Sequence, residues 1–293
     1  MKKIITFLSI EFLLVALLSI PLFVLKPQSG GNLVMVLSVI FMWLPALATL
    51  VTRKLTKDKS DLRVKPRIRE NWRTYLIAVY VPGILIVLGA LLYFMIFPEH
   101  LDLSLGYVKE LLALAGQEMT LPSLGAGELL LISGGLILLA PLVFVNHILA
   151  FGEEVGWRAY LLPLLCEKFG VIKGILLDGV LWGIAHAPLV CFGVNYSGDY
   201  FGKPWTGILM MVVFATTVGI FLSYVTIKTK SVIPACISHG AINAIREAPL
   251  YICVPACNAL LGPKPSGIIG MAGFLAAGVM ILIGFWRKGD CSE

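Results

Sequence analysis

Residues 129–158 read LLLISGGLILLAPLVFVNHILAFGEEVGWR. The apolar part, 129–151, contains no Asp, Glu, Lys or Arg, and it is long enough to cross a membrane, because a helix needs about 20 residues to span about 30 Å of hydrocarbon. The pattern EExxxR follows at once, formed by Glu153, Glu154 and Arg158. A charged side chain in hydrocarbon costs at least about 2.5–3.5 kcal/mol, so such residues usually face a cavity or pair with each other.

The whole chain has the apolar character of this stretch. Hydrophobic residues make up 58% of its 293 residues, charged residues only 14%, and the mean hydropathy is +0.92. Soluble domains average about 25% charged residues, so we expect a multi-pass integral membrane protein. No linker, repeat or low-complexity segment divides the sequence, which predicts a single integral membrane domain over residues 1–293.

Similar apolar stretches recur along the chain, and most of them are long enough to span a bilayer as helix. The first is too long for a signal peptide and is expected to be retained. The seventh is short and contains Pro234 and Gly240, which is tolerated only where protein or a wet cavity surrounds it. We predict an all-α bundle of about eight transmembrane helices. The stretches are 4–25, 33–52, 75–97, 129–151, 174–193, 207–227, 232–245 and 268–286.

The distribution of Lys and Arg predicts the orientation in the membrane. Residues 53–73 contain nine basic side chains, and Lys2 and Lys3 precede the first span. Basic loops favour the cytosolic side, so both termini are expected to be cytosolic and the acidic segment 98–128 external. The sequence pI near 9.0 then reflects topology and contact with lipid headgroups. A partner role for nucleic acid is not expected.

Helical phase separates the polar residues of EExxxR into two roles. Glu154 and Arg158 are four residues apart and share a helix face, where they can neutralise each other. Glu153 is rotated by about 100° from that face, so it remains available as a base. The alternative is an interfacial salt bridge with a second, solvated acid.

Two further polar patterns lie in later spans. Asp178, Trp182 and His186 follow at intervals of four and form one stripe of a helix. His239 and Asn243 lie one turn apart and can donate two hydrogen bonds to one point, as a developing oxyanion requires. The alternative for both patterns is ordinary hydrogen bonding inside or between helices.

The remaining intramembrane polar residues are given smaller roles. Glu11 is expected to reach the interface or pair with a basic residue. His147 lies near the face of Glu154, where support of the motif and simple packing are equally open. Cys253 and Cys257 can form a disulfide on the outer side, and the sequence leaves this open.

The patterns EExxxR, WxxxH and HxxxN, in this order and on membrane helices, resemble the CPBP family. That family includes the CAAX prenyl endopeptidases of the Ras-converting type and bacterial and archaeal relatives, some of them linked to bacteriocin immunity. The resemblance covers about 150–245, the expected catalytic core. It implies eight helices around a cavity open to the cytosol and the bilayer. Trp182 stands where eukaryotic members usually have Phe, and we expect either ring to wall the cavity.

The resemblance also implies roles for individual residues. Glu153 matches the catalytic glutamate and His186 its partner in activating a water molecule. His239 and Asn243 match the pair that binds the oxyanion. The residues expected to support them are Glu154, Arg158, Trp182 and Asp178.

The predicted function is therefore an intramembrane endopeptidase that cleaves near the C-terminus of a lipidated or hydrophobic protein or peptide. Its partners would be that substrate and membrane lipids, and no cofactor is expected to be required. The alternative is a zinc enzyme, in which Glu153, His186 and His239 bind the metal and leave one position open for water.

Two rival functions belong to other classes. A bacteriocin-immunity protein that only binds its target would tolerate loss of Glu153. A small transporter would use the same acids and histidines as a proton relay. Transporters often carry inverted repeats and paired broken helices, and the sequence has one short span and no repeat.

Overall fold

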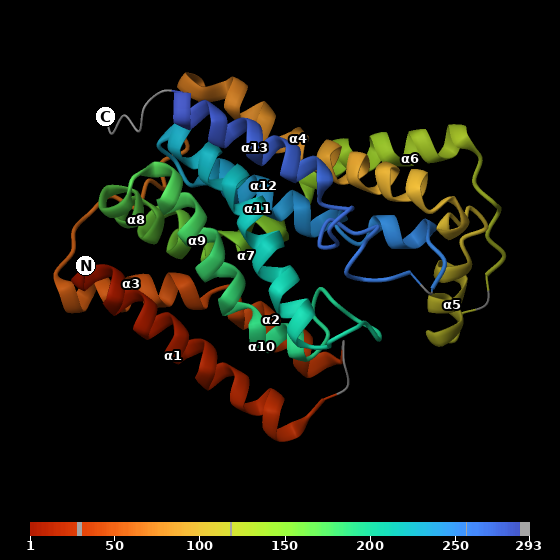
Figure 1. Cartoon of the computed structure of the whole chain (residues 1–293), viewed down its shortest axis with the longest axis horizontal. Helices are drawn as coiled ribbons and strands as arrows, with labels where there is room; N and C mark the ends of the chain where they lie inside the picture. The colour runs from red at the N-terminus through yellow and green to blue at the C-terminus, as the bar shows by residue number, and fades with distance from the viewer. Residues whose placement is uncertain (28–30, 118, 256, 288–293) are drawn as a thin grey trace.

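The structure is a computed structural model, and the predicted all-α class is confirmed over the part of the chain that it describes. The described residues are 1–27, 31–117, 119–255 and 257–287. They contain no β-strand, and their one strand-like pairing is an isolated antiparallel bridge between Leu101 and Cys253. Helices α7, α9, α11 and α12 gather near the centre of the bundle (Figure 1).

The first four helices form the N-terminal part of the bundle. Apolar helices α2 and α3 follow each other so closely that they form one stretch, Asn32–Thr56, long enough to cross a membrane. Pro45 lies in the first turn of α3, where its missing N–H would have no intrahelical partner. The helices are α1 (Lys2–Leu25), α2 (Asn32–Phe41), α3 (Leu44–Thr56) and α4 (Ile68–Ile96).

The stretch that opened the sequence is bent. The apolar stretch 129–151, predicted as a span, is not one continuous helix, because the helical segments Ala126–Leu142 and Phe144–Phe169 meet at 61°. Pro141 lies beside the break and lacks the backbone donor that a continuous helix needs. The elements of this region are η1 (Pro98–His100), α5 (Gly106–Leu114), α6 (Ala126–Leu139), η2 (Ala140–Leu142), α7 (Phe144–Glu154), the π-helix η3 (Val155–Leu161) and α8 (Leu162–Phe169).

The C-terminal helices form the core of the bundle. Helix α9 packs on α11 through Gly179 and Gly183. A Cβ atom at these positions would lie only 2.6 Å from Thr216 Cα and 2.5 Å from Val212 Cα, so only glycine permits the approach. The elements are α9 (Val171–Ala185), α10 (Ala187–Cys191), α11 (Trp205–Thr229), α12 (Ile233–Ile245), η4 (Ala248–Ile252) and α13 (Ala272–Arg287).

Helix α12 approaches α7 in the same manner. A Cβ atom at Gly240 would collide with the ring and backbone of His147. This contact holds the helix of HxxxN against the helix that ends in EExxxR. Two patterns far apart in the sequence therefore lie on touching helices.

Each of the eight predicted apolar stretches contains helix, but the helices differ in length. Among the described residues, four helical stretches are long and apolar enough to cross a membrane, or five if the bent pair is one span. Helices α9, α12 and α13 have 15, 13 and 16 residues and are shorter than a full crossing requires. The short helices α9 and α12 carry most of the predicted site.

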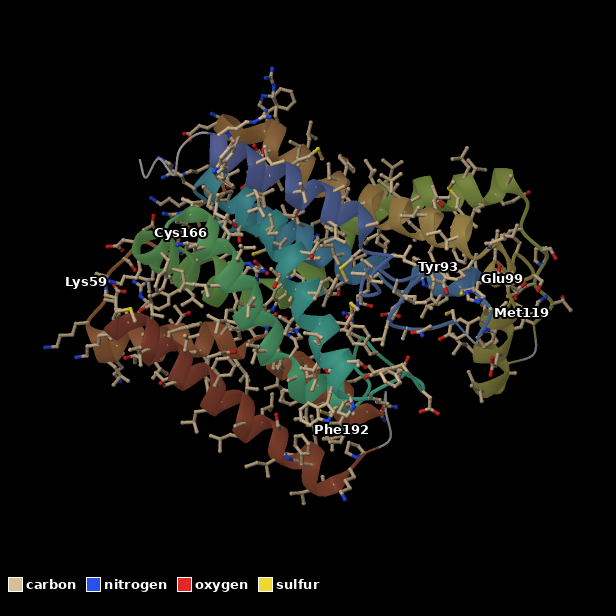
Figure 2. The ribbon with its side chains drawn as sticks, in the orientation of Figure 1. Lys59, Tyr93, Glu99, Met119, Cys166 and Phe192 are labelled. Carbon is tan, nitrogen blue, oxygen red and sulfur yellow. The ribbon has the colours of Figure 1, made fainter. Side chains whose placement is uncertain are left out.

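The two charged segments lie at opposite ends of the long axis of the molecule. Lys59, in the basic segment 53–73, extends from one end, and Glu99 lies at the other end near α5 and α6 (Figure 2). Lys3 joins the basic segment by an ion pair with Asp58, with 3.0 Å between Nζ and Oδ1. This arrangement agrees with the predicted orientation, and the cytosolic placement of the termini stays a prediction.

Candidate active site

A small cavity between α2, α7, α9, α11 and α12 is lined by all four predicted catalytic residues. Its volume is about 90 Å³, which is room for a few water molecules. Four more polar side chains share its wall with the four predicted catalytic residues. The eight polar lining residues are Ser38, Glu153, Trp182, His186, Asn195, His239, Asn243 and Arg246.

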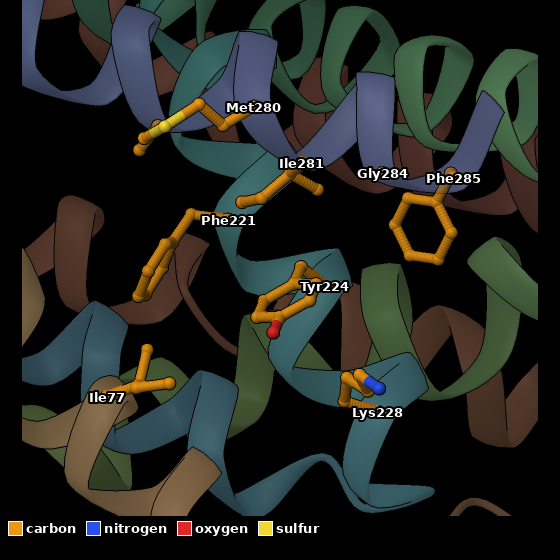
Figure 3. Close-up of a pocket in the computed structure, with 9 residues that line it drawn as sticks. Ile77, Phe221, Tyr224, Lys228, Met280, Ile281, Gly284 and Phe285 are labelled. Atoms are coloured by element: carbon orange, nitrogen blue, oxygen red, sulfur yellow. The ribbon is translucent and has the colours of Figure 1, made fainter. Parts of the chain in front are cut away.

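A larger hollow of about 460 Å³ lies elsewhere, between α4, α11 and α13. Its side chains include Phe221, Tyr224 and Phe285, together with the charged Lys228 (Figure 3). Among the described residues, no carboxylate or imidazole lines this hollow. Size therefore does not identify the site, and the smaller cavity holds the groups that can do acid–base chemistry.

Glu153 lies in the last turn of α7 and is 2% exposed. Its Oε2 atom accepts a hydrogen bond of 2.6 Å from the indole Nε1 of Trp182 on α9. Among the described residues it forms no ion pair with Arg158, which agrees with the phase argument from the sequence. The indole orients the carboxylate without neutralising its charge.

His186 caps the C-terminus of α9 and faces Glu153. Its Nδ1 atom lies 2.9 Å from the backbone carbonyl of Trp182, and since a carbonyl only accepts, Nδ1 carries the hydrogen. In the neutral ring, Nε2 is then the acceptor. This atom lies 4.0 Å from Glu153 Oε2. The ring of Phe41 packs edge-on at 4.9 Å between centroids and holds the imidazole in place.

His239 and Asn243 lie one turn apart on α12, as predicted, and both line the cavity. His239 Nδ1 lies 2.8 Å from Glu154 Oε1, so this nitrogen donates to the carboxylate. The second ring nitrogen, Nε2, is then the one available to the cavity. Asn243 makes no hydrogen bond within the described chain, which leaves its amide free for a ligand.

Arg158 lies at the centre of a buried charge network. Its Nη1 atom is 3.3 Å from Glu154 Oε1, and its Nε atom is 3.4 Å from Asp178 Oδ2. The guanidinium also stacks 4.1 Å from the centre of the Trp182 ring. All three ionic side chains are 0% exposed. The predicted pairing of Glu154 with Arg158 is present, and Asp178 supplies a second carboxylate from α9.

The arginine lies in a π-helix rather than an α-helix. Residues Val155–Leu161 form this wider turn, which the sequence did not indicate. Short π-segments inside helices are frequent at functional sites. Here the segment presses against α3, since a Cβ atom at Gly156 would lie 2.7 Å from the backbone carbonyl carbon of Pro45.

Two cavity residues were missed from the sequence. Arg246 follows Asn243 by three residues, and its Nη1 atom donates a 2.6 Å hydrogen bond to Asn195 Oδ1. The other missed residue is Asn195, which lies in the loop before α11. The position of Arg246 on the HxxxN face was a usable signal, because residues seven apart on a helix share a side.

One smaller expectation, for Glu11, is wrong, and the structure bears on two points that the sequence left open. Glu11 does not reach the interface or pair with a base: it is 0% exposed, and neither carboxyl oxygen has a hydrogen-bond partner in the described chain. His147 Nε2 bonds the carbonyl of Pro141, so its role is packing around the bend. Cys253 and Cys257 are free thiols in this structure.

The zinc alternative was tested against the arrangement of the side chains. In the part of the chain that the structure describes, no three or more His, Cys, Asp or Glu side chains are grouped so as to hold a metal ion. The set Glu153, His186 and His239 therefore does not fit a metal centre here. Dependence on a metal stays a question for experiment.

Comparison with known proteins points to the same part of the chain. Residues 134–245 match the family described as type II CAAX prenyl endopeptidase Rce1-like. The CAAX prenyl protease 2 of Methanococcus maripaludis is 31% identical over 109 residues, which is 36% of this chain and 40% of that relative. The match thus spans less than half of the curated protein. The family match at 134–245 includes every residue of the cavity except Ser38, Phe41 and Met42 before it and Arg246 directly after it. The resemblance found in the sequence is confirmed, and residues 134–245 are similar to the Rce1-like CAAX prenyl endopeptidases.

Proposed function

We propose that the chain is an intramembrane endopeptidase of the CAAX-protease type, which cleaves near the C-terminus of a lipidated or hydrophobic peptide. One observation carries the proposal: Glu153 and His186 turn an oxygen and a nitrogen toward the same cavity at a separation of 4.0 Å. The family match and the relative named as a CAAX prenyl protease support the same activity.

The two groups are arranged to activate water. Glu153 Oε2 is an acceptor, and His186 Nε2 is an acceptor because Nδ1 holds the hydrogen. A water between them donates one O–H to each, so its oxygen lone pairs point away from both and toward a substrate carbonyl. Glu153 takes the proton as the oxygen attacks, and His186 keeps the water in line. The tetrahedral intermediate then collapses: the C–N bond breaks, Glu153 returns its proton to the leaving amine, and no covalent enzyme intermediate forms.

His239 and Asn243 receive the charge that develops on the carbonyl oxygen. Because His239 Nδ1 donates to Glu154, the ring can donate a second hydrogen bond only as imidazolium, from Nε2. The Glu154 carboxylate stabilises that positive form directly. Asn243 adds its amide N–H from the next turn. Loss of one such donor typically raises the barrier by about 3–4 kcal/mol.

The test is Glu153→Gln in purified protein. Glutamine preserves shape and the contact with Trp182 but cannot take a proton, so cleavage of a peptide with an S-farnesyl cysteine near its C-terminus falls about 10²–10⁴-fold. Glu70→Gln is the matched control, because Glu70 is exposed at the start of α4. Both variants keep the melting temperature of the unmodified protein in detergent.

Each rival function gives a different result in the same experiment. A protein that only binds its target, or a transporter, contains no peptide-cleaving activity for Glu153→Gln to remove. Activity that survives the substitution overturns the mechanism. Loss of activity after rigorous chelation, restored by zinc, would favour the metal alternative. Mass spectrometry of membrane peptides from cells with either form then identifies the natural substrate as the uncut species that accumulates in the variant.

A further inference from the structure

Arg246 places a positive charge at one end of the catalytic cavity. It follows Asn243 by three residues and His239 by seven, so all three lie on one side of α12. The helix ends at Ile245, but Arg246 keeps helical angles, with φ −57° and ψ −26°. The proposed water-activation mechanism has no use for this guanidinium.

The charge of Arg246 is only partly neutralised. Its hydrogen-bond partner, the side chain of Asn195, is an uncharged amide. The nearest acid, Glu247, lies 3.5 Å from Arg246 Nε and is shared with Lys264, whose Nζ lies 3.1 Å from the other carboxylate oxygen. Two cations and one carboxylate leave one net positive charge. The Glu247 side chain is also 41% exposed, so water screens its part of the interaction.

The guanidinium of Arg246 is held in place by the loop that carries Asn195, which also contacts Lys264. Asn195 is 9% exposed and has the left-handed φ of 69°, a conformation that Asn adopts more readily than most residues. Its side chain accepts from Arg246, and its backbone carbonyl accepts a 2.9 Å hydrogen bond from Lys264 Nζ. Because the Asn195 loop and the segment that carries Lys264 both contact the end of α12, the guanidinium is fixed relative to His239 and Asn243.

We propose that Arg246 binds the C-terminal carboxylate of the peptide substrate. This inference rests on the proposed endopeptidase function and adds the feature that limits cleavage to the end of a chain. Seven residues of helix from His239 to Arg246 rise about 10.5 Å at about 1.5 Å per residue. An extended peptide covers about 10 Å in three residues. A carboxylate on Arg246 therefore places the bond about three residues from the C-terminus beside His239 and Asn243.

The chemistry of the pair favours this ligand. A guanidinium offers parallel N–H donors that match the two oxygens of a carboxylate. Only the C-terminal end of a peptide supplies a main-chain carboxylate, so an internal segment leaves the Arg246 guanidinium without this partner. Cleavage then depends on the free end of the substrate as well as on the residues around the bond.

The test compares three peptides that differ only at the C-terminus. Each carries an S-farnesyl cysteine four residues from the end: the first has a free carboxylate, the second a terminal amide, and the third a terminal amide with glutamate as the last residue. We expect kcat/KM for the free carboxylate to exceed that for either amide by about 10- to 100-fold, the range of a hydrogen bond to a charged group. Arg246→Gln removes this preference, and Arg246→Lys retains part of it.

The ratio of kcat/KM for the free-carboxylate peptide to that for the amide peptides separates recognition of the carboxylate from a general loss of stability. Arg246→Gln also loses the contact with Asn195, but a purely structural defect would slow all three peptides alike and leave the ratio unchanged. Arg73→Gln is the control, since Arg73 is exposed on α4 and contacts the ring of Trp72. Equal cleavage of all peptides by the unmodified protein, or a ratio unchanged in Arg246→Gln, overturns the proposal. Equal preference for the glutamate peptide would overturn its restriction to the terminal carboxylate.

Binding distinguishes failure of this inference from failure of the proposed function. The three peptides are also titrated against Glu153→Gln, whose cavity keeps its shape. If the unmodified protein cuts none of them but the free carboxylate still binds best through Arg246, the endopeptidase function fails and the carboxylate site stands. If all three peptides are cut at equal rates, the endopeptidase function stands and the carboxylate site fails. If the peptides are neither cut nor bound with preference, both are overturned.

Discussion

Two polar groups lie side by side in this bundle, and they differ in how their charges are paired. The buried network consists of Glu154, Arg158 and Asp178, which are 0% exposed and bind each other. The cavity group consists of Glu153, His186, His239 and Asn243, which each direct polar atoms into the same small space. Both groups draw on α7 and α9, while the π-helix carries Arg158 and α12 carries His239 and Asn243. The ion pairs of the network join the helices, although several of its buried polar atoms lack a hydrogen-bond partner in the described chain. The cavity group instead presents acid, base and amide groups to one open space.

Trp182 and His239 join the two groups. The Trp182 ring stacks on Arg158 while its N–H holds Glu153. His239 donates to Glu154, which also accepts from Arg158. Substitutions in the network should therefore change stability first, and substitutions in the cavity group should change activity first.

The largest effect on stability is expected for Arg158→Met. Removal of the guanidinium leaves Glu154 and Asp178 buried without their counter-ion, and breaking a buried pair in this way costs about 3–5 kcal/mol. Thermal unfolding in detergent measures the change, with Arg73→Met as the exposed control. An unfolding temperature within the error of the control would mean that the network does not hold the bundle together.

Asn243→Ala gives the converse result. Since the amide makes no hydrogen bond within the described chain, its loss should leave thermal stability unchanged. The rate should fall by about 10²–10³-fold, because one donor to the oxyanion is missing. Peptide cleavage and unfolding are measured on the same sample, with Asn71→Ala, on the exposed start of α4, as control. A stability loss as large as that of Arg158→Met would erase the distinction between the two groups.

Sequence reasoning found the parts of the site that depend on helical phase. The pairing of Glu154 with Arg158 and the stripe of Asp178, Trp182 and His186 follow from a repeat of nearly four residues, which any helix of this sequence must show. Because charged side chains in a membrane are costly, the few polar residues of this apolar chain were the natural candidates for a site. The four proposed catalytic residues line one cavity, while their catalytic roles stay predictions.

The features that were missed depend on packing between helices. The π-helix over Val155–Leu161 packs against α3, and no local pattern indicates it. The bend differs, because Pro141 beside it was a local signal that was not used. The bond from Trp182 to Glu153 joins residues on different helices. Arg246 lies one residue beyond the apolar stretch 232–245, which hid its place on the face of α12. Local periodicity predicts which side chains share a face, but not which faces meet.

Trp182→Phe tests the link between the groups and has a smaller expected effect. From the sequence we expected either ring to serve, but phenylalanine cannot donate the 2.6 Å hydrogen bond to Glu153. A hydrogen bond to a charged group contributes about 1.5–3 kcal/mol, so kcat/KM should fall about 10-fold or more while the ring still covers Arg158. Phe41→Leu, on the other side of His186, reports the effect of altered packing alone. Unchanged activity in Trp182→Phe would restore the original expectation.

Glu11→Leu has the smallest expected effect on activity, and it tests whether Glu11 belongs to the buried network, to the cavity group or to neither. Glu11 interacts electrostatically with Glu153, yet it neither lines the cavity nor has a hydrogen-bond partner in the described chain. A buried polar group without a partner costs about 1–3 kcal/mol, so an apolar side chain of similar size should raise the unfolding temperature. Glu70→Leu, on the exposed start of α4, should leave it nearly unchanged. If peptide cleavage stays within a few-fold, Glu11 lies outside both groups. A loss of activity as deep as that of Glu153→Gln, with stability gained, would instead make Glu11 a member of the cavity group that acts through Glu153.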